Sequence, residues 1–256
     1  MRVAAELVAD ILDALRPLVQ PGVSTLDLDV AAERMAREAG AEPAFKGYQG
    51  FPGSLCTSIN DEVVHGIPSS SRVLREGDIV SIDMGVRASG FYGDAAVTLP
   101  VGHVSSGAAA LLRVTEESLW KGIVEARPGN RVSDIGHAVQ AHVETAGFSV
   151  VRQFVGHGIG RALHEEPQVP NYGVRGRGPR LAPGMVLAIE PMVNAGRAAV
   201  REMRDNWTQV TADGSLSAHF EHTVAVTADG PLVLTRSRAA RQSAEAVAAG
   251  EAGHRG

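Results

Sequence analysis

The chain has 256 residues, 44% of them hydrophobic and 21% charged, which is typical of a globular protein with a substantial buried core. Its formal net charge of −5 excludes a general electrostatic attraction to nucleic acid or to an anionic membrane. Cys56 is the only cysteine, which excludes an internal disulfide and favours a cytoplasmic location, and no run of about 18 apolar residues predicts a transmembrane helix.

Two helices are predicted at the start of the chain. Apolar residues recur at helical spacing over residues 3–19, and Pro21-Gly22 ends this helix. A second helix is predicted over residues 27–39, closed by Gly40. A segment with several glycines and a proline follows at 45–60. Strands are then predicted at 78–86 and 91–99.

The second half of the chain repeats this order. Helices are predicted over 107–126, ended by Pro128-Gly129, and over 133–146, closed by Gly147. Strands are predicted near 149–156, 185–193 and 219–227, the last joined as a hairpin to 231–235. Residues 236–256 are alanine-rich, charged and poor in large apolar groups, which predicts a flexible C-terminal tail with room for a short helix.

An offset of 107 residues aligns the two halves, which indicates either a diverged internal repeat or a chance similarity between two helix–strand units. We predict a single domain over 1–235 with pseudo-symmetric halves at about 1–106 and 107–235. Such a repeat would present a carboxylate at the same place in each half. The aligned pairs are Pro21-Gly22 with Pro128-Gly129, Asp27 with Asp134, Ala39-Gly40 with Ala146-Gly147, Gly77 with Gly184, and Ile82-Asp83 with Ile189-Glu190.

Four carboxylates occupy predicted strand positions where acids are depleted. They are Asp83, Asp94, Glu190 and Glu221. Any one of them alone is most simply an exposed or edge residue. Four buried acids would repel one another and raise each other's pKa, and divalent cations are the usual remedy.

One histidine joins this acidic set. Glycines on both sides of His157 allow close approach to the backbone, although a lone histidine is more often structural. Four carboxylates and one imidazole are not a structural zinc set and suit harder ions such as Mn, Fe(II) or Co. Because the negative charge of four carboxylates matches the positive charge of about two divalent ions, the residues favour a two-metal site.

At these residues the sequence resembles the type I methionine aminopeptidases from residue 1 to about 235. The motifs that carry the resemblance are SLCTSINDEVVHGIP, GDIVSIDMGV with FYGD, GHGIGRALHEEPQV, PGMVLAIEPMVN and SLSAHFEHTV. The resemblance implies an α/β pita-bread fold, a pseudo-two-fold antiparallel sheet covered by helices. It also implies a cytoplasmic hydrolase that removes the first methionine from nascent proteins and favours a small second residue.

The resemblance implies a role for each metal ligand. Asp94 and Glu221 would bridge two divalent ions (Co, Mn, Fe(II) or Zn), His157 and Glu190 would complete one site, and Asp83 would chelate the other. A water or hydroxide between the ions would attack the first peptide bond, with Glu190 handling its proton.

The resemblance also implies which residues meet the substrate. His65 would lie near the substrate amine and the scissile amide; taken alone it would be a loop histidine. His164 would hydrogen-bond the peptide and stabilise the tetrahedral intermediate. Leu163 stands where the family commonly has phenylalanine, which leaves the shape of the methionine pocket open. The other pocket residues would be Tyr48, Phe51, Cys56 and Trp207.

Further expectations follow from the same likeness. Asn60 and Ser217 match positions that help bind a monovalent cation in some relatives. The expected partners are nascent N-termini and, transiently, the ribosome, with no DNA, no membrane and a monomeric chain. The chain begins inside the family's first helix, so a start upstream of Met1 is an open alternative.

Three other functions compete with this one. A proline-specific peptidase of the same fold usually carries an additional N-terminal domain, and a creatine-type hydrolase does not keep the metal ligands. A metal-free binding module on this fold would not need all five ligand positions filled with suitable residues, as they are here.

Overall fold

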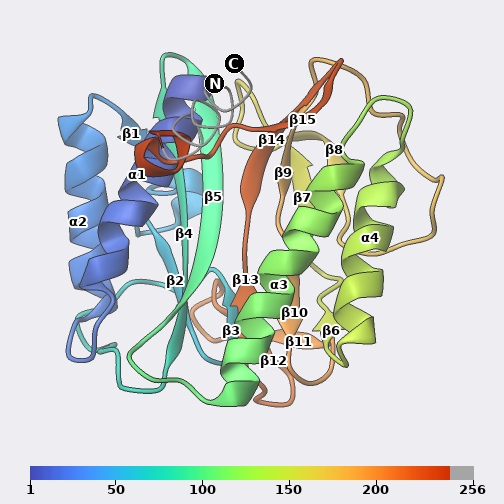
Figure 1. Cartoon of the computed structure of the whole chain (residues 1–256). Coiled ribbons are helices and arrows are strands. Elements are labelled where there is room, and N and C mark those ends of the chain that lie inside the picture. Colours follow the sequence, from blue (N-terminus) through green and yellow to red (C-terminus); the bar gives the residue numbers. More distant parts are fainter. Residues whose placement is uncertain (243–256) are drawn as a thin grey trace, which may run out of the picture.

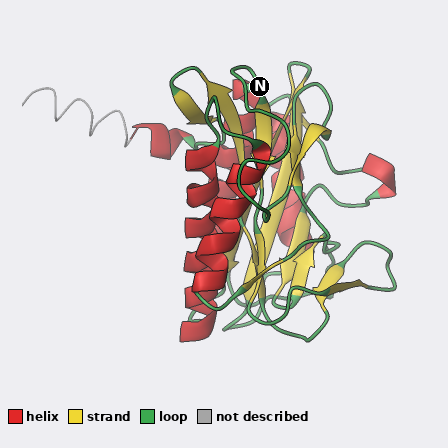
Figure 2. Cartoon of the chain, turned by 90° about the vertical axis from the view of Figure 1, so that its right-hand side faces the viewer, coloured by secondary structure: helices red, strands yellow, loops and turns green. Residues whose placement is uncertain are grey.

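Helices cover a set of strands in the computed structural model of the chain, which describes residues 1–242 (Figure 1). Two helix pairs, one from each half, flank the central strands, and from the side α3 and α4 lie on one face of them (Figures 1 and 2). Residues 243–256 of the predicted tail lie outside the described residues. The four long helices are α1 (Arg2–Leu15), α2 (Thr25–Glu38), α3 (Ser106–Glu125) and α4 (Val132–Thr145).

The ends of the first two helices follow from local chemistry. The predicted helix over 3–19 is too long, because α1 ends at Leu15 and a 3-10 turn, η1 (Arg16–Leu18), follows. Pro17 lies in that turn, and a proline has no N–H for a continuing α-helix. Before α2, the Ser24 N–H donates to the Asp27 carboxylate at 3.0 Å and the Asp27 N–H donates to the Ser24 hydroxyl at 3.2 Å. This capping box starts the helix.

All strand pairs among the described residues are antiparallel. The two predicted strands of the first half are confirmed as β4 (Ile79–Ala88) and β5 (Phe91–Pro100), a long hairpin in the sheet β1-β4-β2. The other sheets have the orders β13-β10-β6, β11-β12-β3 and β15-β14-β9-β7-β8. Their strands, with β1 and β2, are β1 (Glu42–Pro43), β2 (Cys56–Ile59), β3 (Glu62–Val64), β6 (Ser149–Val150), β7 (Gly156–Gly158), β8 (Glu165–Val169), β9 (Val186–Ile189), β10 (Met192–Asn194), β11 (Val200–Glu202), β12 (Gln209–Thr211), β13 (Ser217–His219), β14 (His222–Thr227) and β15 (Gly230–Val233).

The three strands predicted in the second half are each interrupted. Residues 149–156 divide into β6 and the start of β7, 185–193 into β9 and β10, and 219–227 into β13 and β14. One break falls at Glu190-Pro191, where the proline cannot donate to a ladder. A second falls at Phe220-Glu221, and the third separates Val150 of β6 from Gly156 of β7. Two of the four acids therefore lie directly beside strands rather than inside them, which corrects the sequence interpretation.

Positions aligned by the 107-residue offset share their local conformation. Gly22 and Gly129 have φ of 93° and 94°, in the left-handed region that favours glycine. Asp134 accepts a hydrogen bond from the Arg131 N–H at 2.7 Å at the start of α4, as Asp27 does at the start of α2. This agreement supports an internal repeat, and the division into halves near residue 106 stays a proposal.

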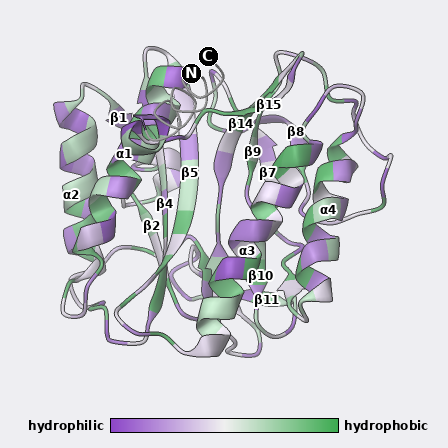
Figure 3. Ribbon diagram, viewed as in Figure 1, coloured by the Kyte–Doolittle hydropathy of each residue, from purple (hydrophilic) through white to green (hydrophobic). Residues whose placement is uncertain are grey.

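Apolar side chains fill the space between helices and strands. Leu15, Leu28, Leu111 and Ile135, one from each long helix, are fully buried, as is Ile82 of β4. Purple hydrophilic bands recur along the outer sides of the helices (Figure 3). Within residues 1–242, no helix is long and apolar enough to span a bilayer.

The first residues of the predicted tail pack against α1. Residues 238–242 are helical, Ser237 is buried, and the Arg238 N–H donates to the Asp10 carboxylate at 2.5 Å. Arg241 lies 3.5 Å from Glu6. This part of the tail is attached to the domain rather than free.

Candidate active site

One cavity of about 240 Å³ collects every side chain that the sequence singled out for chemistry or methionine binding. It is lined by residues of both halves of the chain. The sequence-predicted residues in its wall are Tyr48, Phe51, Cys56, His65, Asp83, Asp94, His157, Leu163, His164, Glu190, Trp207 and Glu221.

Strand pairing brings the acids of the two halves together. Asp83 and Asp94 lie on the neighbouring strands β4 and β5, where Asp83 is opposite Ala96. The Glu221 N–H donates to the Ala96 carbonyl at 2.9 Å. The Thr223 hydroxyl donates to the Asp94 carbonyl at 2.7 Å and accepts from the Asp94 N–H at 3.1 Å. These bonds hold the Glu221 segment against β5.

His157 enters the acidic cluster from β7. Its Nδ1–H donates to the Gly158 carbonyl at 2.9 Å, so Nε2 is available for a metal. That Nε2 lies 3.5 Å from Glu190 Oε1. A Cβ at either flanking glycine, Gly156 or Gly158, would come within 2.2 Å of a backbone carbonyl oxygen. The glycines are therefore required by close backbone packing around the histidine.

The donor set fits a divalent cation. Donor atoms of Asp94, His157 and Glu221 lie within 4.8 Å of one another, and all three residues are buried. One carboxylate oxygen each of Asp83, Asp94 and Glu221 is buried without a hydrogen-bond partner among the described residues. Leaving such oxygens unpaired is costly, and a metal ion is the partner that satisfies several at once.

The electrostatics of the cluster lead to the same conclusion. Burial raises the pKa of Asp94 to about 7. Burial, and then the neighbouring carboxylates, raise the pKa of Asp83, Glu190 and Glu221 well above their usual range. A bound cation would favour the ionised carboxylates and offset this repulsion.

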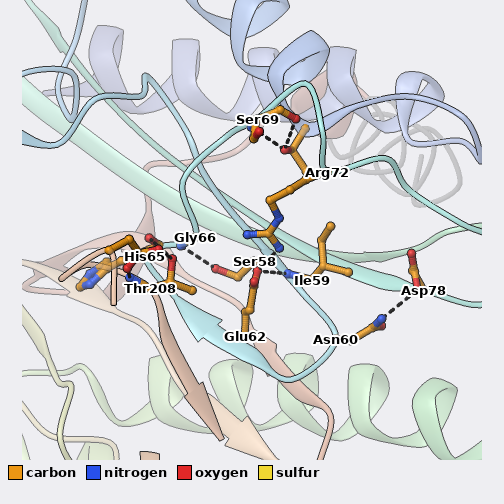
Figure 4. Close-up of polar contacts among 12 residues, drawn as sticks. Ser58, Ile59, Asn60, Glu62, His65, Gly66, Ser69, Arg72, Asp78 and Thr208 are labelled. Carbon is orange, nitrogen blue, oxygen red and sulfur yellow. Dashed lines mark hydrogen bonds and ion pairs between the residues drawn. The ribbon is translucent and has the colours of Figure 1, made fainter. Parts of the chain in front are cut away.

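His65 reaches the cavity from the segment directly after β3 (Figure 4). Its φ of 61° is uncommon for a residue other than glycine. The next N–H, of Gly66, donates to the Ser58 hydroxyl at 3.2 Å, and the Thr208 hydroxyl approaches the His65 carbonyl at 3.5 Å. The imidazole packs edge-on against Phe154, with ring centroids 5.5 Å apart. The strained backbone is thus held from both sides.

Charged side chains stabilise the segment from β2 to His65 (Figure 4). Glu62 accepts a hydrogen bond from the Ile59 N–H at 2.8 Å and forms an ion pair with Arg72. At the turn between β2 and β3, the Asn60 side chain donates to Asp78, and the Asn60 carbonyl accepts from the Ser217 N–H at 2.8 Å. Asn60 and Ser217, expected beside a monovalent cation, are therefore adjacent.

His164 packs against His157, one of the candidate metal ligands. Its Nδ1 is 2.9 Å from the Tyr48 hydroxyl, and its ring centroid is 4.3 Å from that of His157. Burial, and then the proximity of His164, lower the pKa of His65 to about 4. The His65 imidazole is accordingly neutral near pH 7.

The methionine-pocket residues form an apolar wall of the same cavity. Phe51 and Trp207 meet edge to face with ring centroids 5.1 Å apart. Phe51, Cys56 and Leu163 are buried, whereas Tyr48 is exposed at the mouth. Leu163 is 3% exposed, so the leucine that stands where the family commonly has phenylalanine is itself buried in the wall.

The sequence interpretation passed over other lining residues, of which His219 is chemically the most important. It is 2% exposed, and its Nε2 has no hydrogen-bond partner among the described residues. In the sequence it stands two positions before Glu221, a spacing that places both residues on one face of the strand predicted at 219–227. That spacing was the available signal. The other lining residues not predicted are Phe45, Gln49, Val64, Phe154, Val155 and Met192.

Comparison with known proteins identifies close relatives over most of the chain. Residues 1–228 match metallopeptidase family M24. Methionine aminopeptidase 1 of Bacillus subtilis is 57% identical over 236 residues, which cover 92% of this chain and 95% of the relative. Methionine aminopeptidase 1 of Mycobacterium tuberculosis is 50% identical over 241 residues, covering 92% and 91%.

Solved structures agree with this likeness. The methionine aminopeptidase of Thermotoga maritima superimposes with a TM-score of 0.91 at 47% identity, covering 92% of this chain and 95% of that one. The prolidase of Pyrococcus horikoshii has a TM-score of 0.74 at 21% identity, covering 93% of this chain and 61% of its own, which shows the fold alone. Both have the pita-bread fold, so the fold expected from the sequence is confirmed.

Proposed function

The chain belongs to the methionine aminopeptidases of metallopeptidase family M24, and from this premise we propose how its residues remove an N-terminal methionine. The enzyme is a metal-dependent hydrolase of that family. The observation that carries the proposal is the buried set of unpartnered carboxylate oxygens beside the His157 imidazole. Two divalent ions would balance its four carboxylates.

Each ligand candidate has a separate place in the proposal. Asp94 and Glu221, joined through the contacts between β5 and the Glu221 segment, would hold both ions. His157 and Glu190, 3.5 Å apart, would complete one coordination set, and Asp83 on β4 the other. A monovalent cation beside Asn60 and Ser217 is a further, separate element of the proposal.

The hydrolysis then depends on proton handling and positioning by the chain. When bound, the ions supply Lewis acidity and lower the pKa of a water molecule in the cavity. Glu190 takes a proton from the attacking water and passes it to the departing amine as the C–N bond breaks. His65 would lie near the substrate amine and the scissile amide, while His164 would hydrogen-bond the peptide and stabilise the developing oxyanion.

Substrate selection should follow from the apolar wall. We expect kcat/KM for Met-Ala-Ser to exceed that for Leu-Ala-Ser by roughly 10-fold or more, because pocket fit at this scale is worth about 1–3 kcal/mol. A third peptide, Met-Leu-Ser, tests the preference for a small second residue. Steady-state kinetics on the three peptides check both expectations. Better cleavage of leucine or proline than of methionine at the first position would contradict the pocket assignment.

The substrates are the N-termini of nascent proteins, and we extend the proposal to a monomeric, cytoplasmic enzyme that visits the ribosome transiently. We expect the purified protein to cosediment with ribosomes at low salt and to be released at high salt, since exposed charges are screened. Quantitative immunoblotting of gradient fractions measures this. Sedimentation that never follows the ribosome, at any salt concentration, would remove the ribosome from the proposal.

A further inference from the structure

His219 is a buried imidazole at the metal-ligand cluster that none of the proposed steps uses. Its backbone is held on both sides: the Thr98 hydroxyl donates to the His219 carbonyl at 2.7 Å and accepts from the His219 N–H at 2.8 Å. On the other side His219 pairs with Met192 of β10. The side chain therefore enters the cavity from a rigid support.

The unpartnered Nε2 of His219 faces Glu190. It lies 3.9 Å from Glu190 Oε2, while the other oxygen, Oε1, lies 3.5 Å from His157 Nε2. The Glu190 carboxylate thus stands between two imidazoles, and one of them is a metal-ligand candidate. With Oε1 on the His157 side, Oε2 is the oxygen left for His219.

We propose that His219 is a positioning residue whose Nε2–H donates to Glu190 Oε2 and so orients this carboxylate for metal binding and proton transfer. A buried imidazole nitrogen with no partner is costly, and a short closure toward Glu190 supplies the partner. Carboxylates that ligate metals are generally fixed by such outer hydrogen bonds. The inference rests on the proposed metal site.

Metal titration of the apoprotein tests this role. His219→Leu should weaken Mn²⁺ binding by about 10–100-fold, whereas His219→Gln, whose amide still donates, should stay within about threefold of the parent. His222→Gln is the matched control, because His222 flanks Glu221 on the other side, bonds Thr235 and does not line the cavity. Isothermal titration calorimetry gives the dissociation constants, and thermal unfolding of each apoprotein reports folding.

A second measurement observes the hydrogen bond itself. In the Zn²⁺-loaded protein, long-range ¹H–¹⁵N NMR, assigned with the His219→Gln variant, should show His219 protonated at Nε2. An unprotonated or metal-bound Nε2 would overturn the inference, as would unchanged Mn²⁺ affinity in a folded His219→Leu protein or an equal loss in the Gln variant. If both His157→Ala and His219→Leu kept full Mn²⁺ affinity, the metal site itself would be wrong. If His157→Ala lost Mn²⁺ affinity and His219→Leu kept it, only the role of His219 would be wrong.

Discussion

Replacement of His157 by alanine is expected to reduce kcat/KM on Met-Ala-Ser by about 1000-fold, equivalent to about 4 kcal/mol of lost metal-derived stabilisation. His157 supplies the only imidazole in the proposed ligand set, and its Nε2 points toward Glu190 while Nδ1 is held by Gly158. Alanine removes this ligand, so the metal binds less tightly and the negative charge of the carboxylates is less well neutralised. Peptide kinetics and elemental analysis of bound metal measure the effect.

A remote histidine provides the control for this substitution. His137 lies on α4, with Nδ1 3.2 Å from the Gly173 carbonyl and outside the cavity wall. His137→Ala should keep its metal content and near-parental kcat/KM. A His157→Ala protein with near-normal turnover and metal content would show that the ligand set is misassigned.

Thorough chelation of the purified enzyme is expected to abolish activity, and addition of Mn, Co, Fe(II) or Zn should restore it to different extents. Without cations, the buried carboxylates repel one another, and burial with this repulsion raises the pKa of Glu190 and Glu221. Chelation also removes the Lewis acid that would activate the attacking water. Turnover of Met-Ala-Ser before chelation, after it and after each metal addition gives the comparison.

Circular dichroism of the chelated protein separates metal loss from unfolding. The helices and their core contacts lie largely apart from the cavity, so the spectrum should change little. Activity that survived exhaustive chelation, with metal absent by elemental analysis, would exclude the metal mechanism. Recovery by added metal requires the apoprotein to remain folded, which the same spectrum checks.

Local chemistry explains why the helices were predictable to within a few residues. Capping by Ser24 and Asp27, and glycines with positive φ such as Gly22 and Gly129, act within a few residues of where they stand. The first helix was predicted too long because its apolar spacing continues past Pro17, although a proline has no N–H for a continuing α-helix. The strand breaks at Pro191 and Glu221 were missed because long apolar runs look continuous in sequence.

The chemical character of the site could be predicted from the sequence alone, because carboxylates in apolar segments and a histidine between glycines are unfavourable without a cation. The motif resemblance added residue roles, which remain proposals. What the sequence could not decide was distance. Only the tertiary structure shows that the segments holding Asp94 and Glu221 lie side by side. The Thr223 hydroxyl, two residues after Glu221, donates to the Asp94 carbonyl although the two residues are 129 positions apart in the chain. The tertiary structure also identified His219 as a candidate site residue, because its Nε2 lies near Glu190 and has no hydrogen-bond partner among the described residues. Such contacts depend on how the two halves close on each other, which no local pattern encodes.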